Sequence, residues 1–291
     1  MTPSPLISVI IPTYNRSGIL RLTLETVRRQ TFKDFEVWIV GDGCSDDSEQ
    51  AVASFGDDRF HWLNLPENSG TPGKPRNEGL KNANGQYIAY LGHDDLWFPW
   101  HLEGLLAQIR REEWDFVYSL GAAIGPEGVF SIFSLPENLK TQHMGISPSN
   151  WMHKRSLTEA IGPWSSKIKL GDDREFISRL RTHGAKMGCD RQLSVLKFPA
   201  GLWSMYSLSS NFPQEKYVKS MQDNAAALSQ DVLLDFVSAL SKDFGGIRGK
   251  KRLMEPLVRL IRPLFRLYGY DRWPLNRWIN RRYRRRKGLP K

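Results

Sequence analysis

Cysteine is scarce in this chain, and long apolar runs are missing from it. The 291 residues include two cysteines, Cys44 and Cys189, which stand far apart in the sequence. So few thiols argue against a disulfide framework and a thiolate zinc site, and they favour a reducing cytoplasm. No apolar stretch approaches the roughly 18 residues that a membrane-spanning helix needs. The first five residues are polar and lead straight into strand-like sequence, so no signal peptide is expected.

Positive charge is concentrated near the C-terminal end. The net charge is +10, but residues 250–291 contain 15 Lys and Arg against 2 Asp and Glu. The rest of the chain then holds 26 basic and 29 acidic residues, so it is nearly neutral. The whole chain is 40% hydrophobic and 11% aromatic, which is enough apolar material for a sizeable core. We therefore expect one large globular domain that carries a basic appendage.

The first 65 residues alternate between strand-like and helix-like segments. Continuous apolar runs at 6–11 and 35–40 and a shorter one at 59–63 are typical of buried parallel strands. A helix capped by Ser17 and another at about 49–55 separate them. This β-α-β-α-β order predicts a mainly parallel sheet with right-handed crossovers.

Two adjacent carboxylates follow the next predicted strand. Residues 86–91 read as a buried strand, Asp94 and Asp95 come next, and residues 100–109 have a helical apolar pattern. Open α/β sheets bind ligands at the carboxyl ends of their strands. A divalent cation that joins these carboxylates to phosphates would offset their repulsion. The alternative is a surface turn in which an aspartate caps the helix.

Two further stretches contain candidate ligand-binding residues. Asp42 follows the strand at 35–40 between two glycines, where its carboxylate would accept hydrogen bonds from a ribose or a base; a helix-capping turn is the alternative. Lys74 and Arg76 open a helix after a Gly- and Pro-rich loop, so they would meet an anionic group there. For Arg76, a plain surface ion pair is the alternative.

Four blocks of sequence together resemble the family 2 glycosyltransferases of GT-A fold. They are Ser-Val-Ile-Ile-Pro-Thr-Tyr-Asn-Arg at 8–16, Val-Gly-Asp-Gly-Cys-Ser-Asp at 40–46, Lys-Pro-Arg-Asn-Glu-Gly at 74–79 and Leu-Gly-His-Asp-Asp-Leu-Trp at 91–97. Each block is weak evidence alone, but their order and spacing are specific. The resemblance spans about residues 6–210. It implies a nucleotide-diphospho-sugar transferase fold of α/β class, with a mainly parallel central sheet, helices on both faces and a C-terminal helical extension.

The resemblance also implies a role for individual residues. Thr13 and Asp42 would contact the nucleobase and ribose, and Arg76 would line the nucleotide pocket. Asp94 and Asp95 would form the DXD-type element that binds Mn²⁺ or Mg²⁺. Asp95 would be the direct metal ligand, and Asp94 would also contact the donor. This chain departs from the family where Gly92 replaces a further aspartate. It also has Gly41-Asp42-Gly43 where relatives often have Asp-Asp-Gly.

The second half of the resemblance concerns the acceptor. A strand at 115–119 and a hairpin at 121–133 precede Asp172 and Asp173, which match the family's Glu-Asp element at a helix start. Asp173 aligns with the catalytic base. The alternative is that Asp172 or Asp173 caps the helix. Both can hold at once, with Asp172 as the cap and Asp173 facing the sugar. Many relatives carry an Arg and a His within 201–210, and this chain has neither.

The chain is thus divided into a GT-A catalytic domain over residues 1–212 and a basic, amphipathic helical extension over 213–291. Within the first, residues 1–97 form the nucleotide-binding half and 98–212 the acceptor-binding half. Aromatic and aliphatic residues interleave with arginines in the tail, which suits an anionic membrane surface. Packing on the catalytic domain is the second interpretation. Nucleic acid is the least favoured because the apolar face does not suit phosphate tracking.

Together these features predict an inverting, metal-dependent glycosyltransferase of hexosyltransferase type. It would move a sugar from a nucleotide-sugar, with a UDP-sugar expected, to a hydroxyl on a saccharide or lipid-linked acceptor in cell-surface polysaccharide or lipid-linked glycan synthesis. It would work in the cytoplasm, or at the inner face of the membrane. A nucleotidyltransferase and a sugar-nucleotide-binding module without turnover are the alternatives.

Overall fold

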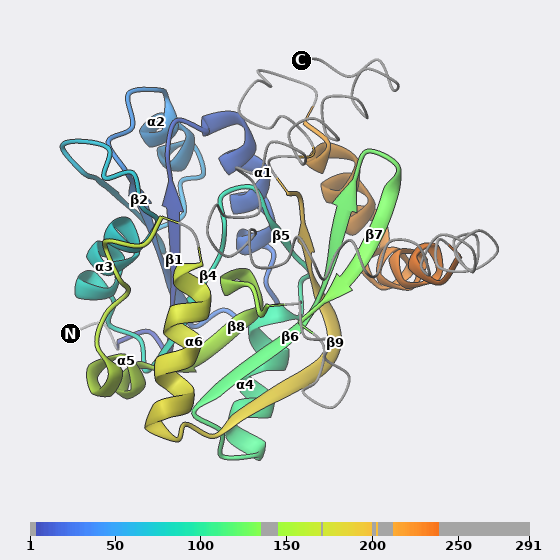
Figure 1. Cartoon of the computed structure of the whole chain (residues 1–291). Helices are drawn as coiled ribbons and strands as arrows, with labels where there is room; N and C mark the ends of the chain where they lie inside the picture. The colour runs from blue at the N-terminus through green and yellow to red at the C-terminus, as the bar shows by residue number, and fades with distance from the viewer. Residues whose placement is uncertain (1–3, 135–144, 170, 200–201, 203–211, 239–291) are drawn as a thin grey trace, which may run out of the picture.

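The computed structural model describes residues 4–134, 145–169, 171–199, 202 and 212–238, and Figure 1 shows the whole chain. Helices and strands alternate through the first half, as the apolar pattern predicts. The helices are α1 (Ser17–Arg28), α2 (Ser48–Ala53), α3 (Gly73–Asn82), α4 (His101–Arg111), α5 (Arg155–Ile161) and α6 (Asp172–His183). The strands are β1 (Ile7–Thr13), β2 (Phe35–Gly41), β3 (Phe60–Asn64), β4 (Tyr87–Tyr90), β5 (Leu96–Trp97), β6 (Phe116–Gly125), β7 (Gly128–Phe133), β8 (Trp151–Lys154) and β9 (Met187–Lys197).

All nine strands belong to one sheet in the order β3-β2-β1-β4-β8-β6-β9-β5, with β7 paired to β6. The pairs among β3, β2, β1 and β4 are parallel, as the β-α-β-α-β pattern predicts. Beyond β4 the sheet is mixed, because β8 runs antiparallel to both β4 and β6, whereas β9 runs parallel to β6. The parallel strands end at one edge of the sheet, and the loops that follow them meet there.

Alternate residues of the strands pack against different helices, because successive side chains point to opposite faces of a sheet. Along β6, Val117 joins the core cluster that contains α4, whereas Phe116 and Tyr118 join the cluster that contains Phe176 of α6. Figure 1 shows α6 in front of the sheet and α4 behind it. The sheet is therefore covered on both faces, as expected of its continuous apolar strands.

The hairpin expected at 121–133 is confirmed, since Gly121 pairs with Phe133 and Gly125 with Gly128. Its first strand continues the strand expected at 115–119, so both belong to β6. One expectation about local structure is wrong. Ser17 does not cap the first helix, since α1 begins at Ser17 itself. The carboxylate of Asp46 accepts the Ser17 N–H at 3.0 Å and also the Ser48 hydroxyl at 2.6 Å. One side chain from a neighbouring loop thus holds the starts of α1 and α2.

A further helix, over residues 214–238, packs on the second half of the sheet. Tyr217, Val218, Met221 and Val232 join Leu96 and other strand residues in one core cluster. The division of the chain at residue 212 stays a prediction. The basic tail from 250 onward and most of the stretch 201–210 lie outside the described residues. Among the residues that are described, no helix is long and apolar enough to cross a membrane.

Phe176 offers a test of how α6 is anchored. Its ring is fully buried and stacks on Trp164 at 4.4 Å between centroids. We expect Phe176→Ala to lower the free energy of unfolding by about 3–5 kcal/mol, because the lost ring leaves a cavity in a packed core. Chemical denaturation measures this change. Phe130→Ala is the control: Phe130 is 50% exposed, and its loss should cost less than about 1 kcal/mol. Equal effects would contradict this account of the core.

Candidate active site

The loop after β4, residues 92–95, is held in place from three elements that are distant in sequence. The hydroxyl of Thr23 in α1 lies 2.8 Å from the His93 carbonyl oxygen and 3.0 Å from that of Asp95, so it donates to one or the other. Gln214, at the start of the last helix, donates to the Asp94 carbonyl at 3.0 Å. The Gly92 N–H donates to Ser149 Oγ at 3.0 Å. We call residues 92–95 the acidic loop.

The carboxylate of Asp95 is fully buried and surrounded by donors. Its Oδ2 accepts from the Ser149 hydroxyl at 2.5 Å and from the Lys197 ammonium at 3.0 Å, and its Oδ1 accepts from the Phe198 N–H at 3.3 Å. Burial raises the pKa of Asp95, and the Lys197 ammonium opposes that rise. Burial alone would lower the pKa of Lys197, but Asp95 and Asp94 outweigh it and raise that pKa, so the ammonium stays charged at neutral pH.

Asp94 is the more available of the two carboxylates. Among the described residues, no hydrogen bond to its side chain is present, whereas both oxygens of Asp95 are engaged. A Cβ atom added at Gly92 would stand 3.1 Å from Asp95 Oδ2 and 3.2 Å from Asp94 Oδ1. Because Gly92 has no side chain, the space between these two carboxylate oxygens stays open. Such hard oxygen ligands fit Mg²⁺ or Mn²⁺. No group of three or more His, Cys, Asp or Glu gathers within the described ranges, so the chain alone does not complete a site there.

Thr13 and Asp42 lie side by side at the ends of β1 and β2. The Asp42 N–H donates to the Thr13 carbonyl at 2.8 Å, and the Asp42 carboxylate accepts from the Ser69 N–H at 3.0 Å. Thr13 is 2% exposed, and in the described part of the chain its hydroxyl has no partner. A buried hydroxyl without a partner is rare in proteins and needs an explanation, such as a bound group that supplies the missing hydrogen bond.

Arg76 joins α3 to the first turn of α6. Its guanidinium forms an ion pair with the Asp172 carboxylate and lies 4.3 Å above the Trp164 ring. The Asn77 side chain fixes Trp164 by donating to its carbonyl at 2.8 Å and accepting its N–H at 2.9 Å. Burial raises the pKa of Asp172, and Arg76 opposes that rise. The expectation that Asp172 caps the helix is wrong, because its carboxylate binds Arg76 and makes no cap hydrogen bond.

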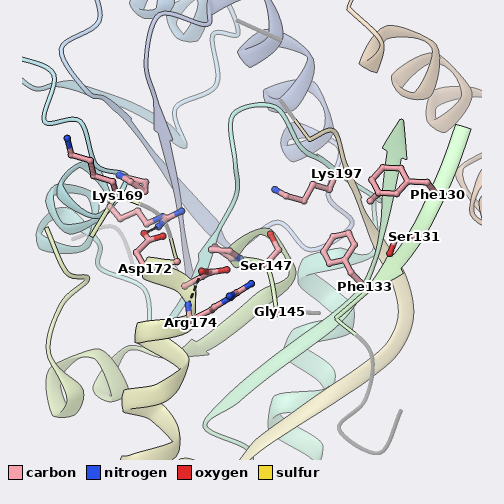
Figure 2. A pocket seen from close by; sticks show the side chains of 15 residues that line it. Phe130, Ser131, Phe133, Gly145, Ser147, Lys169, Asp172, Arg174 and Lys197 are labelled. Atoms are coloured by element: carbon pink, nitrogen blue, oxygen red, sulfur yellow. Dashed lines mark hydrogen bonds and ion pairs between the residues drawn. The ribbon is translucent and has the colours of Figure 1, made fainter. Parts of the chain in front are cut away.

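Asp173 lies beside Asp172 and faces a pocket of about 460 Å³ between α6 and the β6–β7 hairpin. Its carboxylate accepts the N–H of the next residue, Arg174, at 2.8 Å. Figure 2 shows Lys197 pointing into this pocket from one side and Arg174 and Asp172 lying on the other, with Phe130 and Phe133 on the hairpin. The pocket is lined by Pro72, Arg76, Ala123, Phe130, Ser131, Phe133, Gly145, Ser147, Pro148, Lys169, Gly171, Asp172, Asp173, Arg174 and Lys197.

The structure thus gathers the predicted residues into neighbouring groups rather than one cavity. Arg76 and Asp173 line the pocket, and Asp95 reaches it through its ion pair with Lys197. Thr13 and Asp42 lie at the same edge of the sheet but do not line the pocket. The roles of these five residues and of Asp94 stay predictions.

Sequence reasoning missed Lys197. The signal was a lysine at the end of an apolar strand, directly before the buried Phe198.

Comparison with known proteins identifies the family. The model of glycosyl transferase family 2 matches residues 8–162, more than half of the chain. The chain belongs to glycosyltransferase family 2. It is a transferase by family, and the resemblance of the four sequence blocks is confirmed.

Curated relatives of this family 2 glycosyltransferase match it over part of their length. An uncharacterised glycosyltransferase of Rickettsia typhi is 39% identical over 35% of this chain and 31% of its own. A UDP-Glc:alpha-D-GlcNAc-diphosphoundecaprenol beta-1,3-glucosyltransferase of Escherichia coli is 29% identical over 46% of this chain and 53% of its own. The matches thus cover about a third to a half of these relatives.

A solved structure confirms the GT-A fold. S. aureus TarS 1-349 in complex with UDP-GlcNAc superposes with a TM-score of 0.60 and 22% identity, over 84% of this chain and 74% of that one.

The pairing of Arg76 with Asp172 is testable by a double-mutant cycle. Both side chains are about nine-tenths buried. We expect Arg76→Met to lower the free energy of unfolding by about 3–5 kcal/mol, because it leaves a buried carboxylate unpaired. Arg76→Met combined with Asp172→Asn should recover much of that loss. Denaturant titration of the four proteins gives the coupling energy.

The half-buried ion pair of Lys154 with Asp115 is the control for this cycle. Lys154→Met should cost less than about 1 kcal/mol. Strictly additive effects of Arg76→Met and Asp172→Asn would show that the two side chains do not stabilise one another.

Proposed function

We propose that this chain transfers a sugar from a nucleotide-sugar to a hydroxyl acceptor with inversion at the anomeric carbon. The observation that carries the proposal is the pocket that Asp173 lines together with four basic side chains, those of Arg76, Lys169, Arg174 and Lys197. An acid–base group beside positive charge suits a reaction that removes a proton from a hydroxyl and releases an anionic diphosphate.

The donor is proposed to bind at the carboxyl ends of β1, β2 and β4. Thr13 and Asp42 offer a free hydroxyl and a carboxylate to the nucleoside, and Arg76 lies toward the pocket. A UDP-sugar is the proposed donor, since the E. coli relative is named for UDP-Glc and TarS was solved with UDP-GlcNAc. Strand ends of an open α/β sheet are the usual place for such ligands.

A divalent cation is proposed to bind at the acidic loop. Asp94, with its free carboxylate, and Asp95 would hold it, and the phosphates of the donor would complete its ligands. When bound, it would supply positive charge that stabilises the departing diphosphate. Asp95 as the direct ligand stays a prediction, and the hydrogen bonds of Asp95 make Asp94 the more available ligand.

Asp173 is proposed as the base. It takes the proton of the acceptor hydroxyl as that oxygen attacks the anomeric carbon from the face opposite the diphosphate. The new carbon–oxygen bond forms as the bond to the diphosphate oxygen breaks, and the electron pair leaves with the nucleoside diphosphate. No covalent intermediate on the protein is required, so the configuration inverts, as in hydrolases that use one carboxylate to activate the nucleophile.

The acceptor is proposed to be a saccharide or a lipid-linked glycan. The E. coli relative is named for a diphosphoundecaprenol acceptor. Phe130, 50% exposed, and Phe133 place aromatic rings along one side of the pocket, where a sugar face can stack. Binding of the basic tail to an anionic membrane surface would bring the enzyme to such acceptors; that tail lies outside the described residues.

A donor panel tests the proposal. The full-length protein is incubated with Mn²⁺, an undecaprenyl-diphosphate-linked sugar and one of UDP-, GDP- or dTDP-sugars, and release of the nucleotide is measured. We expect release from UDP-sugars that needs the acceptor and falls when EDTA removes the metal. No release from any donor, with the protein folded, would favour a binding module without turnover.

Asp173→Asn tests the base. We expect turnover to fall about 10²–10⁴-fold, because the amide does not take the proton, while binding of the donor changes little. Steady-state rates together with calorimetric binding of UDP separate the two effects. Asp58→Asn, on an exposed aspartate away from the pocket, is the matched control and should keep the wild-type rate. Full turnover by Asp173→Asn would rule out its role as the base.

A further inference from the structure

Lys197 is the one cation of this site that touches the acidic loop, within the residues described. Its ammonium donates to Asp95 Oδ2 at 3.0 Å, and the same side chain lines the pocket that holds Asp173. The side chain is 36% exposed, whereas that of Asp95 is fully buried. An ammonium has three N–H donors. One N–H donates to Asp95. Because the side chain is partly exposed, the other two N–H groups can donate to a ligand in the pocket.

We propose that Lys197 donates hydrogen bonds directly to the diphosphate of the bound nucleotide. This inference rests on the proposed function, and it adds a binding residue that the sequence blocks do not include. The lysine would supply fixed positive charge next to the carboxylates that are proposed to hold a divalent cation.

Three observations carry the proposal. The Lys197 ammonium lies 3.0 Å from Asp95 Oδ2, and the same side chain lines the pocket together with Asp173. Figure 2 shows the Lys197 side chain pointing into the pocket rather than out to the surface. Gly92 contributes no carboxylate, so the acidic loop carries two negative charges, those of Asp94 and Asp95. The Lys197 ammonium offsets one of these two charges. An anionic diphosphate then meets less repulsion from this loop.

A purely structural role for Lys197 predicts a different outcome. If its ammonium only neutralises Asp95, removing it disturbs the acidic loop and affects every ligand of the site alike. If it touches the diphosphate, its loss weakens binding of a nucleoside diphosphate and leaves binding of the nucleoside almost unchanged. Comparison of these two ligands therefore separates the two roles.

The experiment measures binding by calorimetry to full-length wild type and variants, in Mn²⁺ and again in EDTA. The probes are UDP, GDP and dTDP with uridine, guanosine and thymidine, and the diphosphate that wild type binds most tightly is carried forward. We expect Lys197→Met to weaken binding of that diphosphate roughly 10- to 100-fold, as a lost charge-assisted hydrogen bond does, and binding of its nucleoside less than about twofold. Lys197→Arg should retain most of the affinity because it keeps the charge.

Two further variants make the result decisive. Lys197→Gln keeps a hydrogen-bond donor near Asp95 without the charge, so it should fold even if Lys197→Met does not and should show the same loss for the diphosphate. Lys154→Met removes a lysine from another Lys–Asp pair outside the pocket and should change neither affinity. Diphosphate binding by Lys197→Gln at wild-type strength, or an equal loss for diphosphate and nucleoside, overturns the proposal. A wild type that binds none of the diphosphates overturns the proposed function itself.

Discussion

The need to satisfy one buried carboxylate shapes the centre of this molecule. Asp95 is fully buried, and a charge in such a place is stable only if donors surround it. The donors come from Ser149 in the segment before β8 and from Lys197 and Phe198 at the end of β9. Segments more than 50 residues apart in the sequence are thereby fixed to the acidic loop. The positions of Asp94 and Lys197 follow from that arrangement.

A second ion pair joins distant parts of the chain in the same way. Arg76 in α3 binds Asp172 in α6, and Trp164 packs against the guanidinium. The helix that begins with Asp172 also carries Asp173 and is anchored by Phe176. The orientation of the proposed base therefore depends on a salt bridge and on an aromatic core.

The fold was predictable from the sequence because the apolar runs of β1, β2 and β4 show their burial directly. The acidic loop was predicted as a candidate site because ligands bind at strand ends, and Arg76 because anionic groups bind at helix starts; both roles stay predictions. What the sequence did not reveal depends on contacts between distant residues. Asp172 looked like a helix cap until Arg76 was seen to bind it. Lys197 lies in an apolar strand, and its role becomes visible only when Asp95 is placed beside it. The role of Gly121 within β6 was not predictable either, because it makes room for the ring of Phe133 and the side chain of Asn150.

The β6–β7 hairpin has a consequence for how this scaffold can diversify. Phe130 on this hairpin is 50% exposed. By contrast, a Cβ added at Gly73, where α3 meets the 164–165 loop, would clash with the Ser165 carbonyl at 2.3 Å. Substitutions are thus tolerated more easily at Phe130 on the hairpin than at Gly73, at the start of the helix that carries Arg76. Substitutions at Phe130 can therefore reshape one wall of the pocket while the ion pair of Arg76 with Asp172 stays intact.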